Sequence, residues 1–195
     1  MRSAAVAMCT ALALFPAAAT AQEATGQPEV VRTFAPGGVI YLDLSAGDYT
    51  VKGTDDGVIR VTWNTRDGNR SSGWADIQVQ GTKATIRTRG PRNRFNVQIE
   101  LPRRSDLDMT LSAGELDLRD VEGNKRLSMW AGEATMQLGD ADLYKRVDAT
   151  VRAGEISAPP LGRSTGGLFR SLHWDGKGKY TVSASLLAGE IKLVR

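Results

Sequence analysis

The chain has 195 residues, of which 41% are hydrophobic, 24% charged and 6% aromatic. Its 21 glycines and 7 prolines are too few for a collagen-like or low-complexity chain. The length suits one domain with a sizeable core. The net charge of +3 is too small to argue for a nucleic-acid partner.

The first 21 residues have the features of a secretory signal peptide. Arg2 supplies a positive charge, residues 4–15 are apolar, and residues 19–21 form a small-residue cleavage site. The apolar stretch is too short to span a bilayer, and we expect no membrane span in the mature chain. The sequence therefore predicts export to the periplasm or the cell surface, with one mature domain over residues 22–195.

The part of the chain between Gly47 and Gly114 contains strand candidates without the Ala-Gly corner described below. Apolar and polar residues alternate in four stretches, which predict strands at 58–63, 77–80, 84–88 and 95–101. Polar loops separate them. We expect this part to be a less regular, sheet-like region joined to the repeats that follow.

The tripeptide Ala-Gly-acid occurs five times, with its glycine at Gly47, Gly114, Gly132, Gly154 and Gly189. The residues five and three before each glycine, and two and four after it, are all apolar or tyrosine. The positions between them are mostly polar. This alternation predicts two short strands with one buried face, joined by a tight corner at which the glycine takes a positive φ.

The spacing of the corners favours a repeat architecture. Successive glycines from Gly114 to Gly189 are 18, 22 and 35 residues apart. Periods near 20 with strands at a fixed phase predict an all-β, single-chain β-solenoid of at least four stacked corners. A meander of independent hairpins is the alternative. No helical period occurs in the mature chain.

These features resemble the bacterial "putative adhesin" domain family of exported β-helix proteins. The resemblance lies in residues 39–48, the strand Val97–Pro102, the repeated Gly-acid corners, and the closing segment 176–180 with its terminal strand pair. It covers about residues 30–194. It implies a β-solenoid at the cell envelope and supplies no catalytic residue and no cofactor.

The acids that follow the corner glycines form the most regular polar feature. In a parallel stack Glu115, Glu133 and Glu155 would lie one strand apart, at a spacing of ~4.8 Å. Like charges this close repel, so the row would need solvent, a basic neighbour such as Arg152, or a divalent cation. We expect solvated corner residues and no metal site, because the repeat of calcium-binding β-rolls is absent.

Arginines gather in one segment of the less regular part. They are Arg87, Arg89, Arg92, Arg94, Arg103 and Arg104. The first four are candidate contacts for a phosphate or an anionic polysaccharide. The alternative is a charged rim that protects an edge strand from pairing with other molecules.

The long gap before the last corner contains an insertion at residues 159–179. Its Phe169, His173 and Trp174 are candidate ligand contacts, because loops on a rigid scaffold commonly carry recognition. The alternative is that the loop folds back and covers an exposed flank of the stack. Trp130 is a further candidate, since it stands in an outward phase where other repeats have serine or arginine; it either stacks on a ligand or lies beneath the same loop.

Catalysis has little support in the residues. Cys9 is the only cysteine and leaves with the signal peptide, while a single histidine excludes any two-histidine metal site. Asp175 is too close in sequence to be an obvious orienting partner for His173 in a Ser-His-Asp set.

We predict an exported, non-enzymatic envelope protein with an adhesin-like binding or structural role. Its partner would be an envelope polysaccharide or another surface protein. A β-helix enzyme that acts on polysaccharide through carboxylates is the alternative.

Overall fold

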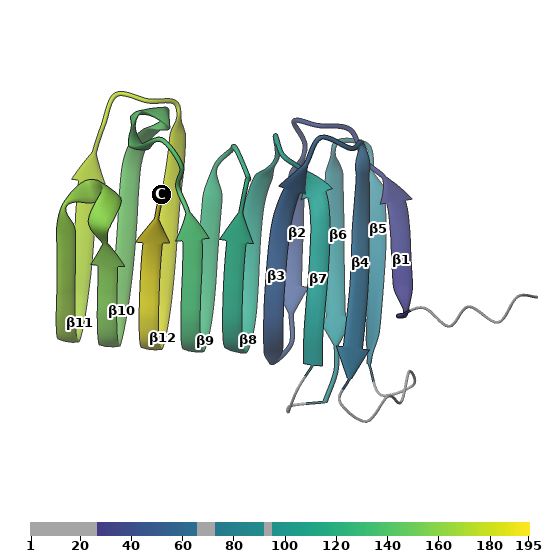
Figure 1. Ribbon diagram of the computed structural model, residues 1–195, viewed down its shortest axis with the longest axis horizontal. Coiled ribbons are helices and arrows are strands. Elements are labelled where there is room, and N and C mark those ends of the chain that lie inside the picture. The colour runs from purple at the N-terminus through teal and green to yellow at the C-terminus, as the bar shows by residue number, and fades with distance from the viewer. Residues whose placement is uncertain (1–26, 66–72, 92–94) are drawn as a thin grey trace, which may run out of the picture.

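The computed structural model describes residues 27–65, 73–91 and 95–195. Within these residues twelve strands join one hydrogen-bonded network, and the only helices are the short 3₁₀ turns η2 (Ala141–Leu143) and η3 (Pro159–Leu161). The all-β prediction is confirmed. Figure 1 shows an elongated row of strands, with β1 towards one end and β11 at the other. The predicted signal peptide lies outside the described residues.

Seven strands make up the less regular region. They are β1 (Glu29–Thr33), β2 (Val39–Leu44), β3 (Gly47–Thr54), β4 (Val58–Thr65), β5 (Trp74–Gln80), β6 (Lys83–Arg89) and β7 (Phe95–Pro102). One branch runs β2–β6–β5 and the other β3–β7–β4–β1. In Figure 1 the second branch lies in front of the first. The four strands predicted from alternation are therefore confirmed.

Each of the remaining corner tripeptides lies in the middle of one long, bent strand. These strands are β8 (Asp106–Arg119), β9 (Lys125–Gln137), β10 (Tyr144–Ala158) and β12 (Tyr180–Val194). We name the part before the glycine the first arm and the part after it the second arm; β2 and β3 are the corresponding arms around Gly47. Neighbouring corners pair in parallel and glycine to glycine. Hairpins pair antiparallel, so the meander alternative is wrong for the corner strands.

The close approach of neighbouring backbones explains the glycine at the bends. Four corner glycines, from Gly114 to Gly189, have φ between +121° and +144°. A Cβ on any of them would lie 1.7–2.0 Å from the carbonyl oxygen of the next corner glycine. The predicted positive φ is thus confirmed for these four and wrong for Gly47, where a Cβ would instead meet a carbonyl oxygen of β7 at 2.6 Å.

The core lies between the two sets of arms. All twenty flanking positions that the sequence marks as apolar or tyrosine are buried, from Leu42 in the first corner to Leu193 in the last. Because side chains alternate between the faces of a strand, the residues between them point outward. The described buried apolar residues form one continuous cluster, which also includes the inner face of the less regular region.

The order of strands in the stack differs from their order in the chain. The last strand, β12, pairs with β9 on one side and with β10 on the other. Figure 1 shows β12 between these two strands. Glu115 and Glu133 are neighbours as predicted, but Glu190 separates Glu133 from Glu155, so that part of the prediction is wrong.

The insertion at 159–179 is mainly a strand. After η3 the chain returns as β11 (Arg163–Asp175), which pairs antiparallel with β10 along its whole length. The prediction of a loop is therefore wrong, because the ladder with β10 orders a segment that has no apolar alternation of its own. β11 covers the hydrogen-bonding edge of β10 and becomes the last strand of the stack.

Candidate functional site

The outer face of the first arms carries rows of side chains that run across the strands. Two residues before each corner glycine stand Ser45, Ser112, Trp130, Leu187 and Arg152, given in stack order. Two residues earlier, β2 has Asp43, but the first arms of β8, β9, β12 and β10 and the neighbouring strand β11 carry a row of hydroxyl side chains, which we call the hydroxyl row. Its members are Thr110, Ser128, Ser185, Thr150 and Ser171, and all are exposed.

Over β9, β12, β10 and β11, side chains of these two rows line an open groove of about 640 Å³, which we call the corner groove. Apolar side chains at its rim are exposed to an unusual degree: 69% for Trp130, 78% for Phe169 and 40% for Leu187. Leu168, next to Phe169, is 68% exposed. The structure thus brings together Trp130 and Phe169, two candidates that are 39 residues apart in the chain.

Phe169 is held in a conformation that its side chain disfavours. Its φ is +52°, in the left-handed region that costs a bulky residue about 1–2 kcal/mol. Burial does not offset this cost, because the ring faces solvent. Strain without a compensating contact is typical of sites kept for recognition rather than for stability.

Trp174 and His173 lie farther along β11, outside the corner groove. The indole of Trp174 is half-buried and packs against the core, and a Cβ on Gly176 would lie 2.3 Å from its ring. This geometry is that of a side chain that seals the end of the stack. Of the candidates in the insertion, only Phe169 lines the groove.

His173 is fixed between two carboxylates. Its Nδ1 lies 2.5 Å from Oδ1 of Asp148 on β10, and its Nε2 lies 2.8 Å from Oδ2 of Asp175. The hydrogen bonds to Asp148 and Asp175 raise the pKa of the imidazole. The sequence-based dismissal of Asp175 is wrong, because residues i and i+2 of a strand share one face. With both nitrogens engaged, His173 ties β11 to β10.

The arginine candidates are interleaved with acids. On the outer face of β6, Arg87 stands in register between Asp43 of β2 and Asp76 of β5. Arg89 lies 3.9 Å from the Asp43 carboxylate. Neighbouring acids reduce the attraction of such a surface for anions. Arg92 and Arg94 lie outside the described residues.

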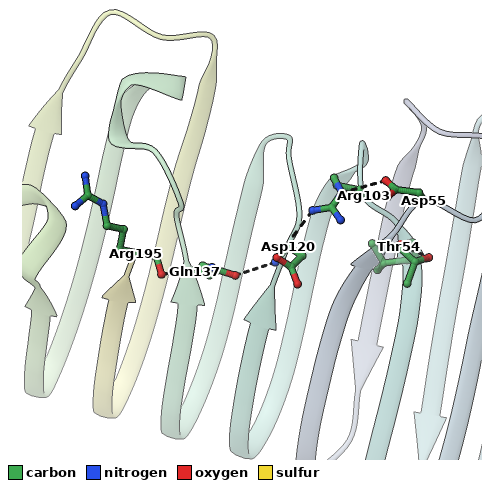
Figure 2. A network of polar contacts seen from close by, with 7 residues as sticks. Thr54, Asp55, Arg103, Asp120, Gln137 and Arg195 are labelled. Carbon is green, nitrogen blue, oxygen red and sulfur yellow. Dashed lines mark hydrogen bonds and ion pairs between the residues drawn. The ribbon is translucent and has the colours of Figure 1, made fainter.

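Arg103 belongs to a polar network at the ends of the second arms (Figure 2). Its Nε donates to Asp55 at 3.1 Å, and its Nη1 lies 3.9 Å from Asp120. The Asp120 amide donates to the side chain of Gln137 at 3.1 Å, and Gln137 donates to the carbonyl oxygen of Arg195 at 3.4 Å. These contacts connect successive strands, so the role of Arg103 is to stabilise the stack.

The corner acids form a continuous row. Asp48, Glu115, Glu133, Glu190 and Glu155 follow one another in register on neighbouring strands. The Lys192 ammonium lies 2.7 Å from Glu133 and 3.2 Å from Glu190, and it offsets the repulsion between these two. Among the described residues, no group of three or more histidine, cysteine or acidic side chains is arranged to hold a metal ion.

Sequence reasoning missed a buried charge. Lys125, on the first arm of β9, is 2% exposed and donates to the Tyr144 hydroxyl at 2.5 Å. Burial lowers the pKa of Lys125 to about 8 and raises that of Tyr144 to about 12. A comparison of the repeats indicates that this lysine is buried, because the apolar residues Leu107 and Val182 occupy the same register position in the neighbouring strands.

Within the described part of the chain, no helix has the length and apolarity needed to cross a membrane. No family model and no curated protein matches the sequence. Several solved structures are similar to it. A putative cell adhesion protein from Clostridium sporogenes has 14% identity and a TM-score of 0.48, over 86% of this chain and 99% of that one.

Two further structures are similar over most of both chains. A putative adhesin from Bacteroides fragilis has 13% identity and a TM-score of 0.29, over 87% of this chain and 98% of that one. A putative adhesin from Parabacteroides merdae has 12% identity and a TM-score of 0.26, over 88% and 98%. All three are bacterial proteins that bear the name of a putative adhesin or a putative cell adhesion protein.

Proposed function

We propose that the protein is an exported, non-enzymatic binding module of the cell envelope whose ligand lies in the corner groove. In this proposal the stacked corner strands form a β-solenoid that acts as a rigid scaffold. The groove then rests on regular, hydrogen-bonded strands, which hold its side chains at fixed spacing before any ligand arrives.

One observation supports the proposal above the others. Trp130, Leu187 and Phe169 expose apolar surface on strands of the same stack, and all three line one groove. Single exposed apolar residues are ordinary, but a contiguous exposed patch marks an interaction site. The corners of β2–β3 and of β8 have serine where β9 has Trp130, so the stack does not require an aromatic residue there.

The arrangement of the acids supports a binding role over polysaccharide cleavage. A glycosidase needs two carboxylates about 5–10 Å apart on opposite sides of the scissile bond. The corner acids instead follow one another along a single row, and Lys192 binds two of them. None of the residues that line the corner groove is acidic.

The proposal is tested by removing the aromatic groups while the fold is kept. Trp130→Ser introduces the residue of the equivalent corners, and Phe169→Gly removes the ring and relieves the positive φ. We expect both variants to bind isolated cell envelopes at least about tenfold more weakly than the wild type, as is common for buried aromatic contacts. Their melting temperatures should not fall.

The matched control is Trp74→Ser, which removes an exposed indole from β5, a strand outside the corner groove. It should leave binding unchanged. If the two groove variants bind as tightly as the wild type, the corner groove is not the binding site. Turnover of a polysaccharide that a carboxylate variant abolishes would instead establish the enzymatic alternative.

The proposed export of the protein can be tested separately from its binding. The predicted signal peptide should be removed after Ala21, so the N-terminal residue of the mature protein should be Gln22. Cell fractionation followed by N-terminal sequencing tests both the location and the cleavage site. An uncleaved chain in the cytoplasmic fraction would contradict the proposal.

A further inference from the structure

The corner groove differs in charge from the surface on the other side of the corner. Its lining contains Arg152 and Arg170 and no acidic residue. A second pocket, on the outer face of the second arms, is the reverse: it is lined by Asp48, Glu115, Asp117 and Glu133 and by no basic residue, although Lys192 binds Glu133 beside it. A cationic groove and an acidic pocket therefore lie on the two sides of the corner.

The guanidinium groups in the groove are available to a ligand. Arg152 forms no ion pair with any residue that the structure describes, whereas Arg60, Arg103 and Arg119 each have a carboxylate partner. Arg170 uses its Nε to donate to the carbonyl oxygen of Gly166 at 2.9 Å, and its other nitrogens remain free of protein acceptors. A guanidinium in this state favours carboxylate or phosphate as a partner.

The hydroxyl row is also largely unused by the protein. Of its five members, within the described residues only Ser185 makes a hydrogen bond through its hydroxyl, to the Leu127 carbonyl oxygen at 3.4 Å. The others present free donors and acceptors at the strand spacing of ~4.8 Å. This spacing is close to the length that one pyranose adds to an extended glycan.

The row nearer the corner runs from Trp130 through Leu187 and Arg152 to Phe169, parallel to the hydroxyl row. From Trp130 on β9 to Phe169 on β11 it crosses three strand intervals, or roughly 14 Å. Aromatic faces stack on the apolar faces of sugar rings, while hydroxyl groups bond to their edges. A small, regular groove of this kind fits a few consecutive sugar residues better than the broad surface of a folded protein.

We propose that the ligand of the corner groove is an acidic polysaccharide whose chain lies across the strands. Its sugar rings stack on Trp130 and Phe169, its hydroxyls bond to the hydroxyl row, and its carboxylates pair with Arg152 and Arg170. This inference rests on the proposed function and specifies its ligand.

The test compares polygalacturonate with its fully methyl-esterified form, which keeps the sugar chain and removes the charge. Poly-glutamate serves as an anionic chain without sugar rings. We expect the mature protein to bind polygalacturonate at least about tenfold more tightly than either of the other two. Arg152→Gln and Trp130→Ser should each weaken binding of polygalacturonate by a similar factor, while Arg163→Gln, on β11 outside the groove, should not.

The outcomes separate the ligand from the site. No binding of polygalacturonate, or equal binding of its ester or of poly-glutamate, would overturn the acidic-polysaccharide assignment. The proposed function would survive those results if binding to cell envelopes still depended on Trp130. Loss of that dependence would refute the site itself. A melting temperature equal to that of the wild type shows that each variant is folded.

Discussion

At the residue scale, Lys125 is a charge in a position that the repeat otherwise fills with aliphatic side chains. Among the described residues its ammonium has one hydrogen-bond partner, Tyr144, and it lies 4.9 Å from the centroid of the Tyr144 ring. Burial of a charge with so few partners costs free energy, and the lowered pKa of Lys125 measures that cost.

This lysine predicts a pH dependence of stability. Its pKa is about 8 when folded and near 10.5 when unfolded, so between these values the unfolded chain binds more protons. The free energy of unfolding should therefore rise from about pH 8 upward. Above pH 10 the opposite trend should begin, because folding raises the pKa of Tyr144 and the folded state keeps its proton longer.

Denaturant titrations across this range test the prediction, with Lys125→Met as the variant that should lose the rise. Lys125→Met alone leaves the Tyr144 hydroxyl without its partner. The double variant Lys125→Met/Tyr144→Phe removes both polar groups and should be more stable than the wild type at neutral pH by about 1–3 kcal/mol. A wild-type stability that is flat from pH 8 to 10.5 would contradict the buried charge.

A second prediction at this scale concerns the corner glycines. Gly132→Ala adds a Cβ that meets the Gly114 carbonyl oxygen at 1.9 Å, in a residue with positive φ. Strain and overpacking together should lower the free energy of unfolding by about 3 kcal/mol or more. Gly139→Ala is the matched control, because Gly139 has φ +69° and open space around it. Its cost should stay near 1 kcal/mol; equal costs would show that the close approach is unimportant.

At the element scale, β11 depends on its ladder with β10 and on the His173 contacts. The pKa of His173 is raised, so the stabilisation from its imidazolium is complete below the ordinary value of 6.5 and is lost as pH rises through the elevated pKa. Hydrogen exchange of the β11 amides, corrected for intrinsic rates, should therefore accelerate over that range. His173→Gln should remove the pH dependence, and β1, the edge strand at the other end, should not show it.

The elements differ in how far the sequence predicts them. The corner strands follow from the sequence, because apolar alternation around Ala-Gly-acid is local and each strand repeats it. β11 does not, because Gly166 and Gly167 interrupt it and its partner orders it through backbone bonds. The sequence predicts only part of the corner groove. It marks Trp130 and Phe169 as separate candidates, whereas their shared site with Leu187 and Arg152 follows from the order of the strands in the stack.

At the scale of the whole molecule, the position of β12 determines whether the stack is continuous. β12 forms parallel ladders with β9 and β10, and β9 and β10 do not pair with each other. Deletion of residues 180–195 should therefore expose two strand edges and part of the core at once. We expect the truncated chain to be digested by protease far faster than the wild type. A truncated protein with wild-type protection would show that β9 and β10 can close the gap themselves.

The position of β12 also makes completion of the stack depend on a strand that comes after both of its partners in the chain. Val182 pairs with Lys125, which is made 57 residues earlier, so the earlier strands must wait with an open slot until the last segment of the chain is available. A chain that stops short, or that is still threaded through a ribosome or a membrane channel, keeps that slot unfilled. The order of the strands thus makes β12 a checkpoint for quality control, because a copy without it should present unpaired strand edges to the proteases that remove incompletely folded chains.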